Sequence, residues 1–167
     1  GHSDKDNIIK EYRGIREQTI STQKALQLTL VNDAVMGSVW NKYYRKNLLK
    51  NIKFDKSLSL CEDMHFNAIA LNSVESDYVV KIISKPLYCY IENPCSVTHD
   101  EGTLFDEKDE LKYIVALKAI MRDCALDKST LSMAKMKIAC FAIDFCAYKK
   151  IDKNKKEKLI TEIHKNY

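Results

Sequence analysis

The sequence predicts a mainly α-helical α+β fold with a few short strands, on the strength of three observations. Glycine and proline are scarce, at 4 and 2 residues in a chain of 167, so few positions interrupt a helix. Aliphatic residues recur at helical spacing along most of the chain. Two short runs, residues 78–83 and 87–91, are instead rich in β-branched and aromatic residues, which favour strands.

The sequence of the N-terminal third predicts several short elements, one after another along the chain. Residues 1–3, Gly-His-Ser, resemble the remnant of a cleaved affinity tag. Amphipathic spacing predicts helices over 4–18 and 21–31, with Ser21 or Thr22 capping the second. Residues 37–40 are expected to be extended, and a brief helix follows over 45–50.

The rest of the chain predicts one central helix, two strands and three further helices. Ser-Leu-Cys-Glu at 59–62 has the form of a capping box and opens a helix that runs to about Asn72. The runs at 78–83 and 87–91 are separated by Ser-Lys-Pro and should be neighbouring strands or edge strands. Helices are expected over 106–125, 128–149 and 153–165. We therefore expect a first part over 4–103 and an all-helical extension over 104–167.

Composition and charge exclude some classes of function. No apolar run is long enough to cross a bilayer. The formal net charge of +4 is mild and much of it lies in 149–158, so we expect no nucleic-acid partner. That basic stretch predicts a solvated helix face, with contact to an anionic membrane surface as the alternative.

Cysteine usage favours a cytoplasmic protein with reduced thiols. The chain has 6 cysteines and no Cys-x-x-Cys pair. Cys61 and His65 have the same spacing as Cys95 and His99, which supplies four soft metal ligands. Structural zinc sites normally contain a tight Cys-x-x-Cys turn, so the sequence predicts no metal site in this chain.

Glu62 and Asp63 form the most chemically suggestive pair. Two adjacent carboxylates repel each other, which favours proton acceptance by at least one of them. On a helix that begins near Cys61, Asp63 and Asn67 share one face at a spacing of i,i+4. The alternative is that Glu62 completes the capping box and Asp63 only complements the helix dipole.

Several spaced motifs occur in an order that resembles bacterial family 2 glycosyltransferases. They are Trp-Asn-Lys-Tyr-Tyr-Arg at 40–45, Ile-Lys-Phe at 52–54, Glu-Asp-Met-His-Phe-Asn at 62–67, Pro-Leu-Tyr-Cys-Tyr at 86–90 and Ser-Val-Thr at 96–98. The resemblance covers roughly residues 33–99 and is to the acceptor-side half of the GT-A catalytic domain. The C-terminal helices match only as the kind of variable extension that such enzymes carry.

The resemblance implies an inverting transfer of a hexosyl-type sugar from a nucleotide sugar to a glycan or lipid-linked acceptor in cell-surface polysaccharide assembly. Asp63 would be the general base, Glu62 would orient it, and Asn67 would hold the helix against the site. The remaining implied site residues lie on the acceptor or donor side: Trp40, Asn41, Lys42, Ser96 and His99. Ser96 and His99 would belong to a loop that closes over the donor diphosphate, although Ile91 stands where such enzymes often have an Arg.

The resemblance also implies what lies outside this chain. Mg²⁺ or Mn²⁺ would be held by an Asp-x-Asp motif in a nucleotide-binding half that precedes these residues. We therefore expect a fragment that is inactive alone and that could form a homodimer through surface exposed by truncation. No Gln-x-x-Arg-Trp motif follows the base, which implies a non-processive enzyme. The expected location is the cytoplasm, with peripheral contact to the inner face of the membrane.

A non-enzymatic helical module for protein–protein interaction is the alternative function. In that case Glu62 and Asp63 would only begin a helix, and residues 104–165 would present an oligomerisation face.

Overall fold

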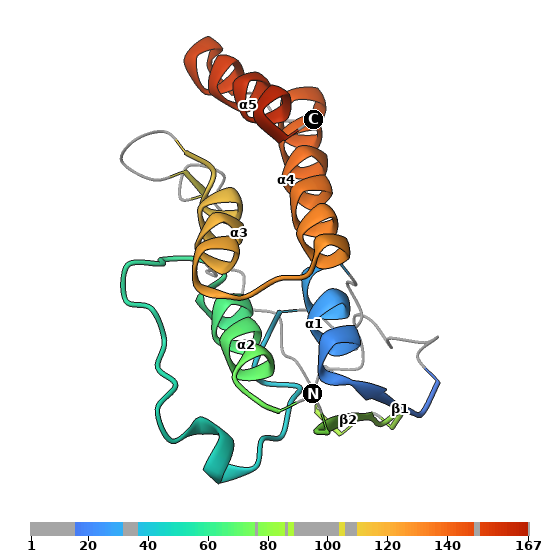
Figure 1. Ribbon diagram of the computed structural model, residues 1–167. Coiled ribbons are helices and arrows are strands. Elements are labelled where there is room, and N and C mark those ends of the chain that lie inside the picture. The colour runs from blue at the N-terminus through green and yellow to red at the C-terminus, as the bar shows by residue number, and fades with distance from the viewer. Residues whose placement is uncertain are drawn as a thin grey trace, which may run out of the picture.

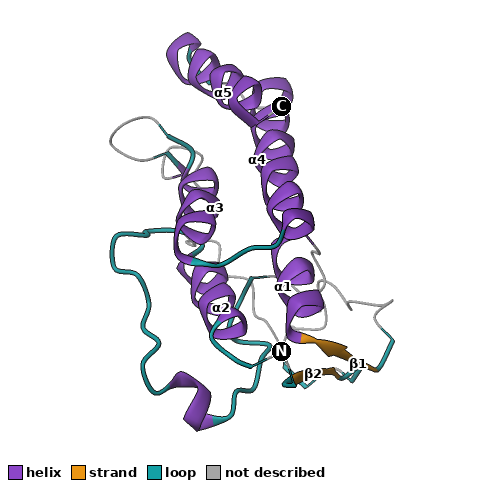
Figure 2. Ribbon diagram, viewed as in Figure 1, coloured by secondary structure: helices purple, strands orange, loops and turns teal. Residues whose placement is uncertain are grey.

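The computed structural model describes residues 16–31, 37–75, 77–85, 87–88, 104–105, 110–148 and 151–166 (Figure 1). Helices dominate and one small antiparallel sheet lies at the base of the molecule (Figure 2), which confirms the predicted mainly helical α+β fold. The elements are β1 (Gln18–Ser21), α1 (Thr22–Val31), the 3₁₀-helix η1 (Lys46–Leu49), α2 (Glu62–Asn72), β2 (Val79–Ile82), α3 (Lys112–Asp123), α4 (Lys128–Tyr148) and α5 (Lys153–Asn166).

The sheet corrects two predictions. β1 pairs antiparallel with β2, with Gln18 opposite Ile82 and Ser21 opposite Val79. Residues 16–18 are therefore not helical, and the remainder of the helix predicted over 4–18 lies outside the described residues. The run at 78–83 forms a strand as expected, but its partner is β1, and Leu87 and Tyr88 lie outside any strand. Local β-propensity identified the strand, whereas its partner depends on long-range pairing.

Side-chain caps explain where three of the helices begin. The backbone N–H of Lys24 donates to Oγ of Ser21 at 3.2 Å, which confirms the predicted cap of α1. Asp127 accepts from the backbone N–H of Thr130 at 2.6 Å, and α4 starts at the residue after Asp127. Asp152 does the same for α5, accepting from Lys155 N–H at 3.0 Å.

The start of α2 is different and overturns the predicted capping box. The residue before the helix is Cys61, with left-handed backbone angles of φ 60° and ψ 20°, and its side chain makes no capping hydrogen bond. Glu62 is thus the first helical residue and cannot serve as the third residue of a box begun at Ser59. The predicted end of this helix at Asn72 is confirmed.

The hydrophobic core lies between the helices, with α3 at its centre. Leu117 and Ile120 of α3 are fully buried, and the core extends to Leu30 of α1, Ala68 of α2 and Ile138 of α4. Helix α3 packs against both α2 and α4, and α1 packs against both α2 and α4 (Figure 1). This arrangement holds α2 between α1 and α3 and leaves its N-terminal turn beside the segment that starts at Gly37.

The C-terminal helices confirm the predicted segments with small changes in their bounds. α3 starts at Lys112, because Leu111 is extended and forms an isolated bridge with Phe105. α5 packs along α4, and Lys118 of α3 pairs with Glu162 of α5 at 2.8 Å. Among the helices described, none combines the length and apolar character that a membrane crossing needs.

Candidate functional site

Asp63 lies in the first turn of α2 and contacts the turn formed by residues 37–42. The backbone N–H of Val39 donates to Oδ2 of Asp63 at 3.1 Å. Residues 37–40, expected to be extended, instead bend into this turn, in which Lys42 N–H donates to the Val39 carbonyl at 3.1 Å. Among the described residues Oδ1 of Asp63 accepts no hydrogen bond. One carboxylate oxygen is therefore held in place and the other is available.

Asn67 lies one helical turn after Asp63 and anchors the same segment. It is 1% exposed, and its amide nitrogen donates to the carbonyls of Gly37 and Ser38, the latter at 3.3 Å. Its amide oxygen accepts from the hydroxyl of Tyr44. Burial, and secondly the charge of Asp63, raises the pKa of Tyr44, so the phenol keeps the proton that it donates. Asn67 thus joins α2 to the turn at 37–38 and to Tyr44.

Lys42 reaches back over the turn. Its ammonium donates to the Ser38 carbonyl at 2.6 Å and to Oδ1 of Asn41 at 2.8 Å. Burial lowers the pKa of Lys42 to about 8, and the nearby charge of Asp63 opposes that shift. A cationic or readily neutralised amine therefore lies within electrostatic reach of the Asp63 carboxylate.

Trp40 is half-buried and pairs with Tyr88, with ring centroids 4.8 Å apart and planes tilted by 30°. Tyr88 is 55% exposed, so this aromatic pair lies at the surface and not in the core. Trp40 of the motif at 40–45 and Tyr88 of the motif at 86–90 thus meet in space.

Phe66 forms an aromatic support behind the site. Phe54 stacks on Phe66 at 4.4 Å between centroids, and Tyr44 meets Phe66 edge-on at 6.0 Å. Each such pair stabilises the fold by roughly 0.5–1.5 kcal/mol beyond the contribution of the apolar area that it buries. The cluster fixes Tyr44 and Phe54 against α2. It could not be predicted from the sequence, because aromatic pairing across a loop has no periodic signal.

The structure describes only one of the three other predicted site residues, Glu62. Glu62 is half-buried at the start of α2, and among the described residues its carboxylate makes no hydrogen bond or ion pair. Ser96 and His99 lie outside the described residues. Lys42 therefore lies within electrostatic reach of Asp63, and Asp63 and Asn67 are bonded to residues 37–39, just before Trp40 and Asn41.

Gly37 is a site residue that the sequence analysis did not identify. A Cβ at this position would lie 2.4 Å from Cβ and 2.9 Å from Cα of Met64. The turn can therefore approach α2 only because residue 37 lacks a side chain. A lone glycine three residues before the Trp-Asn-Lys motif was the signal that could have revealed it.

The arrangement supports proton transfer and substrate positioning. It combines a fixed carboxylate with one available oxygen, an ammonium nearby, and a surface aromatic pair of the kind that packs against apolar or sugar faces.

Comparison with known proteins gives one partial likeness. The chain is 39% identical over 62 residues to a protein of Bacillus subtilis (strain 168) described as "Uncharacterized glycosyltransferase EpsJ". The match covers 36% of this chain and 17% of that protein, so the chain spans only a small part of its length. No family model matches the chain, and no solved structure does. The chain is thus related in part to a glycosyltransferase, which suggests a role in glycosyl transfer.

Proposed function

We propose that this chain is the acceptor-side part of an inverting, non-processive glycosyltransferase of family 2 with the GT-A fold. The observation that carries the proposal is the hydrogen bond from Val39 N–H to Asp63. It joins the motif at 62–67 to the turn that leads into the motif at 40–45, and the resemblance assigns both motifs to one acceptor site. The partial likeness to a glycosyltransferase supports the same class.

Asp63 is the general base of the proposed reaction. Its available oxygen takes the proton of an acceptor hydroxyl while that hydroxyl oxygen bonds to the anomeric carbon of a nucleotide sugar. The bond from this carbon to the nucleoside diphosphate breaks, and its electron pair leaves with the diphosphate. An alcohol is a weak nucleophile at neutral pH, so a positioned base contributes about two to four decades in rate.

Val39, Asn67 and Lys42 position the base and the acceptor. The Val39 amide fixes the orientation of the Asp63 carboxylate, and Asn67 fixes the turn that carries Val39. The charge of Asp63 raises the pKa of Lys42 against the larger effect of burial, so an amine lies beside the proposed base. Tyr88, which is 55% exposed and packs against Trp40, provides an apolar ring against which a sugar ring of the acceptor packs.

The whole enzyme is proposed to use a nucleotide sugar and Mg²⁺ or Mn²⁺ and to serve cell-surface polysaccharide assembly. The ion would neutralise the donor diphosphate. The described residues around Asp63 contain no Asp-x-Asp pair and do not fit that ion. A glycan or lipid-linked acceptor, peripheral membrane contact through 149–158 and a cytoplasmic location belong to the same proposal.

The test uses the full-length protein with a panel of nucleotide sugars and Mg²⁺ or Mn²⁺. Asp63→Asn is compared with the wild type for donor binding and for turnover. Asp77→Asn, a change at an exposed aspartate beyond α2, is the matched control. We expect Asp63→Asn to bind the donor normally and to lose about two to four decades in kcat.

Two results would contradict the proposal. One is a wild type that binds no nucleotide sugar. The other is an Asp63→Asn variant that loses thermal stability but keeps its turnover, which would make Asp63 a residue of the helix terminus and favour the interaction module.

A further inference from the structure

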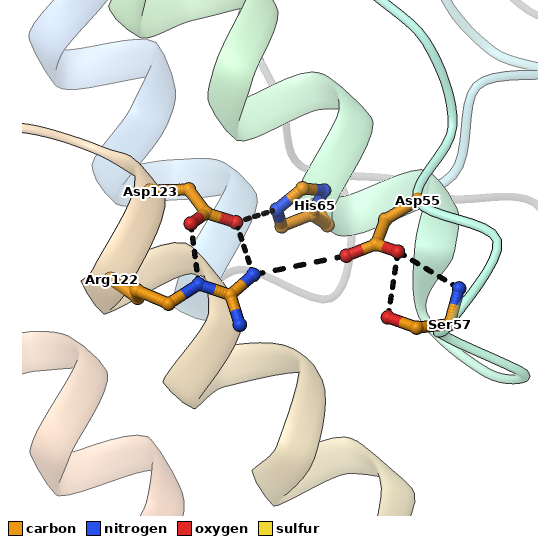
Figure 3. A network of polar contacts seen from close by, with 5 residues as sticks. All are labelled: Asp55, Ser57, His65, Arg122 and Asp123. Carbon is orange, nitrogen blue, oxygen red and sulfur yellow. Dashed lines mark hydrogen bonds and ion pairs between the residues drawn. The ribbon is translucent and has the colours of Figure 1, made fainter.

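Three side chains that could bind a metal ion come from separate elements and lie close together beside α2, away from the proposed acceptor site. Asp55 comes from the loop after η1, His65 from α2 and Asp123 from the last turn of α3 (Figure 3). One ligand atom from each lies within 4.8 Å of the other two. His65 follows Asp63 by two residues, which places it about 200° around the helix from the proposed base.

The two carboxylates are held by their outer oxygens. Oδ1 of Asp55 accepts from the backbone N–H of Ser57 at 2.8 Å and from its hydroxyl at 2.7 Å. Oδ1 of Asp123 accepts from Nε of Arg122 at 2.6 Å. Oδ2 of Asp123 faces Nε2 of His65 at 2.9 Å, and Oδ2 of Asp55 faces the same space (Figure 3). The two bonds from Ser57 are of the kind that orients a metal-binding carboxylate.

A cationic group already lies among these atoms. The terminal nitrogen of Arg122 is 2.7 Å from Oδ2 of Asp123 and 3.9 Å from Oδ2 of Asp55. The Arg122 side chain is 66% exposed, whereas those of Asp55, His65 and Asp123 are 24%, 6% and 27% exposed. The guanidinium is therefore the member of the group that can rotate into solvent.

We propose that Asp55, His65 and Asp123 form a binding site for a divalent first-row transition metal ion, which takes the place of the terminal nitrogen of Arg122. One imidazole and two carboxylates are ligands that such ions accept. The ordinary metal–ligand distance of about 2.0–2.2 Å requires ligand atoms about 3–4 Å apart, so small side-chain movements close the observed spacing. The partial exposure of both aspartates leaves a path for the ion and room for water ligands.

His65 and Cys61 determine the character of the site. Nδ1 of His65 is buried and has no hydrogen-bond partner among the described residues. Metal binding at Nε2 leaves the ring proton on Nδ1 without an acceptor, so the ion binds less tightly than at a fully supported histidine. Cys61 lies one turn before His65, but its sulfur is not among the ligand atoms that gather at this site, so it is not a ligand.

The test measures Co²⁺ and Zn²⁺ binding by this 167-residue chain, without nucleotide sugar. Co²⁺ absorption distinguishes oxygen and nitrogen ligands from thiolates, and Zn²⁺ competition gives the affinity. We expect one ion per chain and a visible Co²⁺ spectrum without a thiolate charge-transfer band. The outcome is independent of glycosyl transfer, so either proposal can fail without the other.

Variants separate this site from adventitious binding. His65→Gln and Asp123→Asn should each lower the affinity at least tenfold. Ser57→Ala, which removes only a support of Asp55, should lower it about tenfold. Arg122→Gln removes the competing charge and should raise the affinity. Asp152→Asn, at an exposed aspartate that caps α5, is the matched control and should change nothing.

Two results would contradict the proposed metal site. Equal metal affinity in the wild type, His65→Gln and Asp55→Asn would overturn the proposal, as would a thiolate band in the Co²⁺ spectrum. Far-ultraviolet circular dichroism shows whether His65→Gln remains folded. Asp55→Asn, Ser57→Ala and Arg122→Gln alter less buried positions, and they test the site even if His65→Gln unfolds.

Discussion

The backbone N–H of Val39 and Oδ2 of Asp63 are joined by a hydrogen bond of 3.1 Å between a turn and the first helical turn of α2. The bond uses a main-chain donor, so no substitution at residue 39 other than proline removes it. The orientation of the proposed base is thus determined by the path of the backbone over 37–42, and the site depends on whatever holds that path.

Gly37→Ala should disturb this path. The added methyl group would lie 2.4 Å from Cβ of Met64, so the turn must move away from α2. We expect a loss of about 1–3 kcal/mol in the free energy of unfolding, measured by urea denaturation. Ser38→Ala, at the next residue, should cost less than about 0.5 kcal/mol. Equal stability of the two variants would show that the turn is not tightly packed on α2.

Lys42 should lose its charge at unusually low pH. Burial lowers its pKa from 10.5 to about 8, so its ¹³Cε resonance should titrate near pH 8 in ¹³C-lysine-labelled protein. Lys42→Arg identifies the signal by removing it. Asp63→Asn should lower the midpoint further, because the Asp63 charge raises this pKa.

The same shift has a consequence for stability. The folded chain binds fewer protons than the unfolded chain between about pH 8 and pH 10.5, so the contribution of Lys42 to the free energy of unfolding rises with pH across that window. Lys42→Met should remove this rise. A titration midpoint of Lys42 near pH 10.5 in the wild type would contradict both the lowered pKa and the expected rise of stability with pH.

Cys61 occupies a left-handed conformation at φ 60° and ψ 20°, which is costly for residues with a Cβ. Cys61→Gly should relieve about 1 kcal/mol of backbone strain and lose a similar amount of packing, so the stability should change little. Cys61→Val keeps an apolar side chain but adds β-branching, and should destabilise by more than about 1 kcal/mol. Thermal melts of both variants test these expectations. A Cys61→Val variant more stable than the wild type would show that the backbone at residue 61 is not strained.

Asp123 should contribute stability that disappears in acid. Its hydrogen bonds to Arg122, and secondly to His65, lower its pKa from 3.8 to about 2. The contribution is fully present above about pH 4 and is lost as the pH falls to about 2. The difference in free energy of unfolding between wild type and Asp123→Asn should therefore shrink over this range. A difference that does not vary with pH would contradict the ion pair.

The helices were largely predictable from the sequence because their signals are local. Ser21, Asp127 and Asp152 cap helices through the residue three positions ahead, and the apolar spacing of α3 and α4 follows the helical period. The apolar character of α2 and its end at Asn72 could be read in the same way.

The errors arose where distant segments determine the structure. Nothing near Gln18 indicates that it pairs with Ile82, and the left-handed Cys61 replaces a capping box that the residue types alone permitted. The pairing of His65 with Asp123 was equally hidden, because it requires α3 to lie against α2. Asp63 and Asn67 could be picked out by spacing, but their common partner, the turn at 37–39, could not.

The pairing of β1 with β2 also has a consequence for the order of folding. The turn at 37–42 and the whole of α2 lie in the stretch of chain that this pairing closes into a loop. Closing such a loop costs entropy before its contacts form, whereas α4 and α5 are adjacent in sequence and can associate early. Refolding followed by pulsed hydrogen exchange should therefore protect the amides of α4 and α5 first and the Val39 amide last.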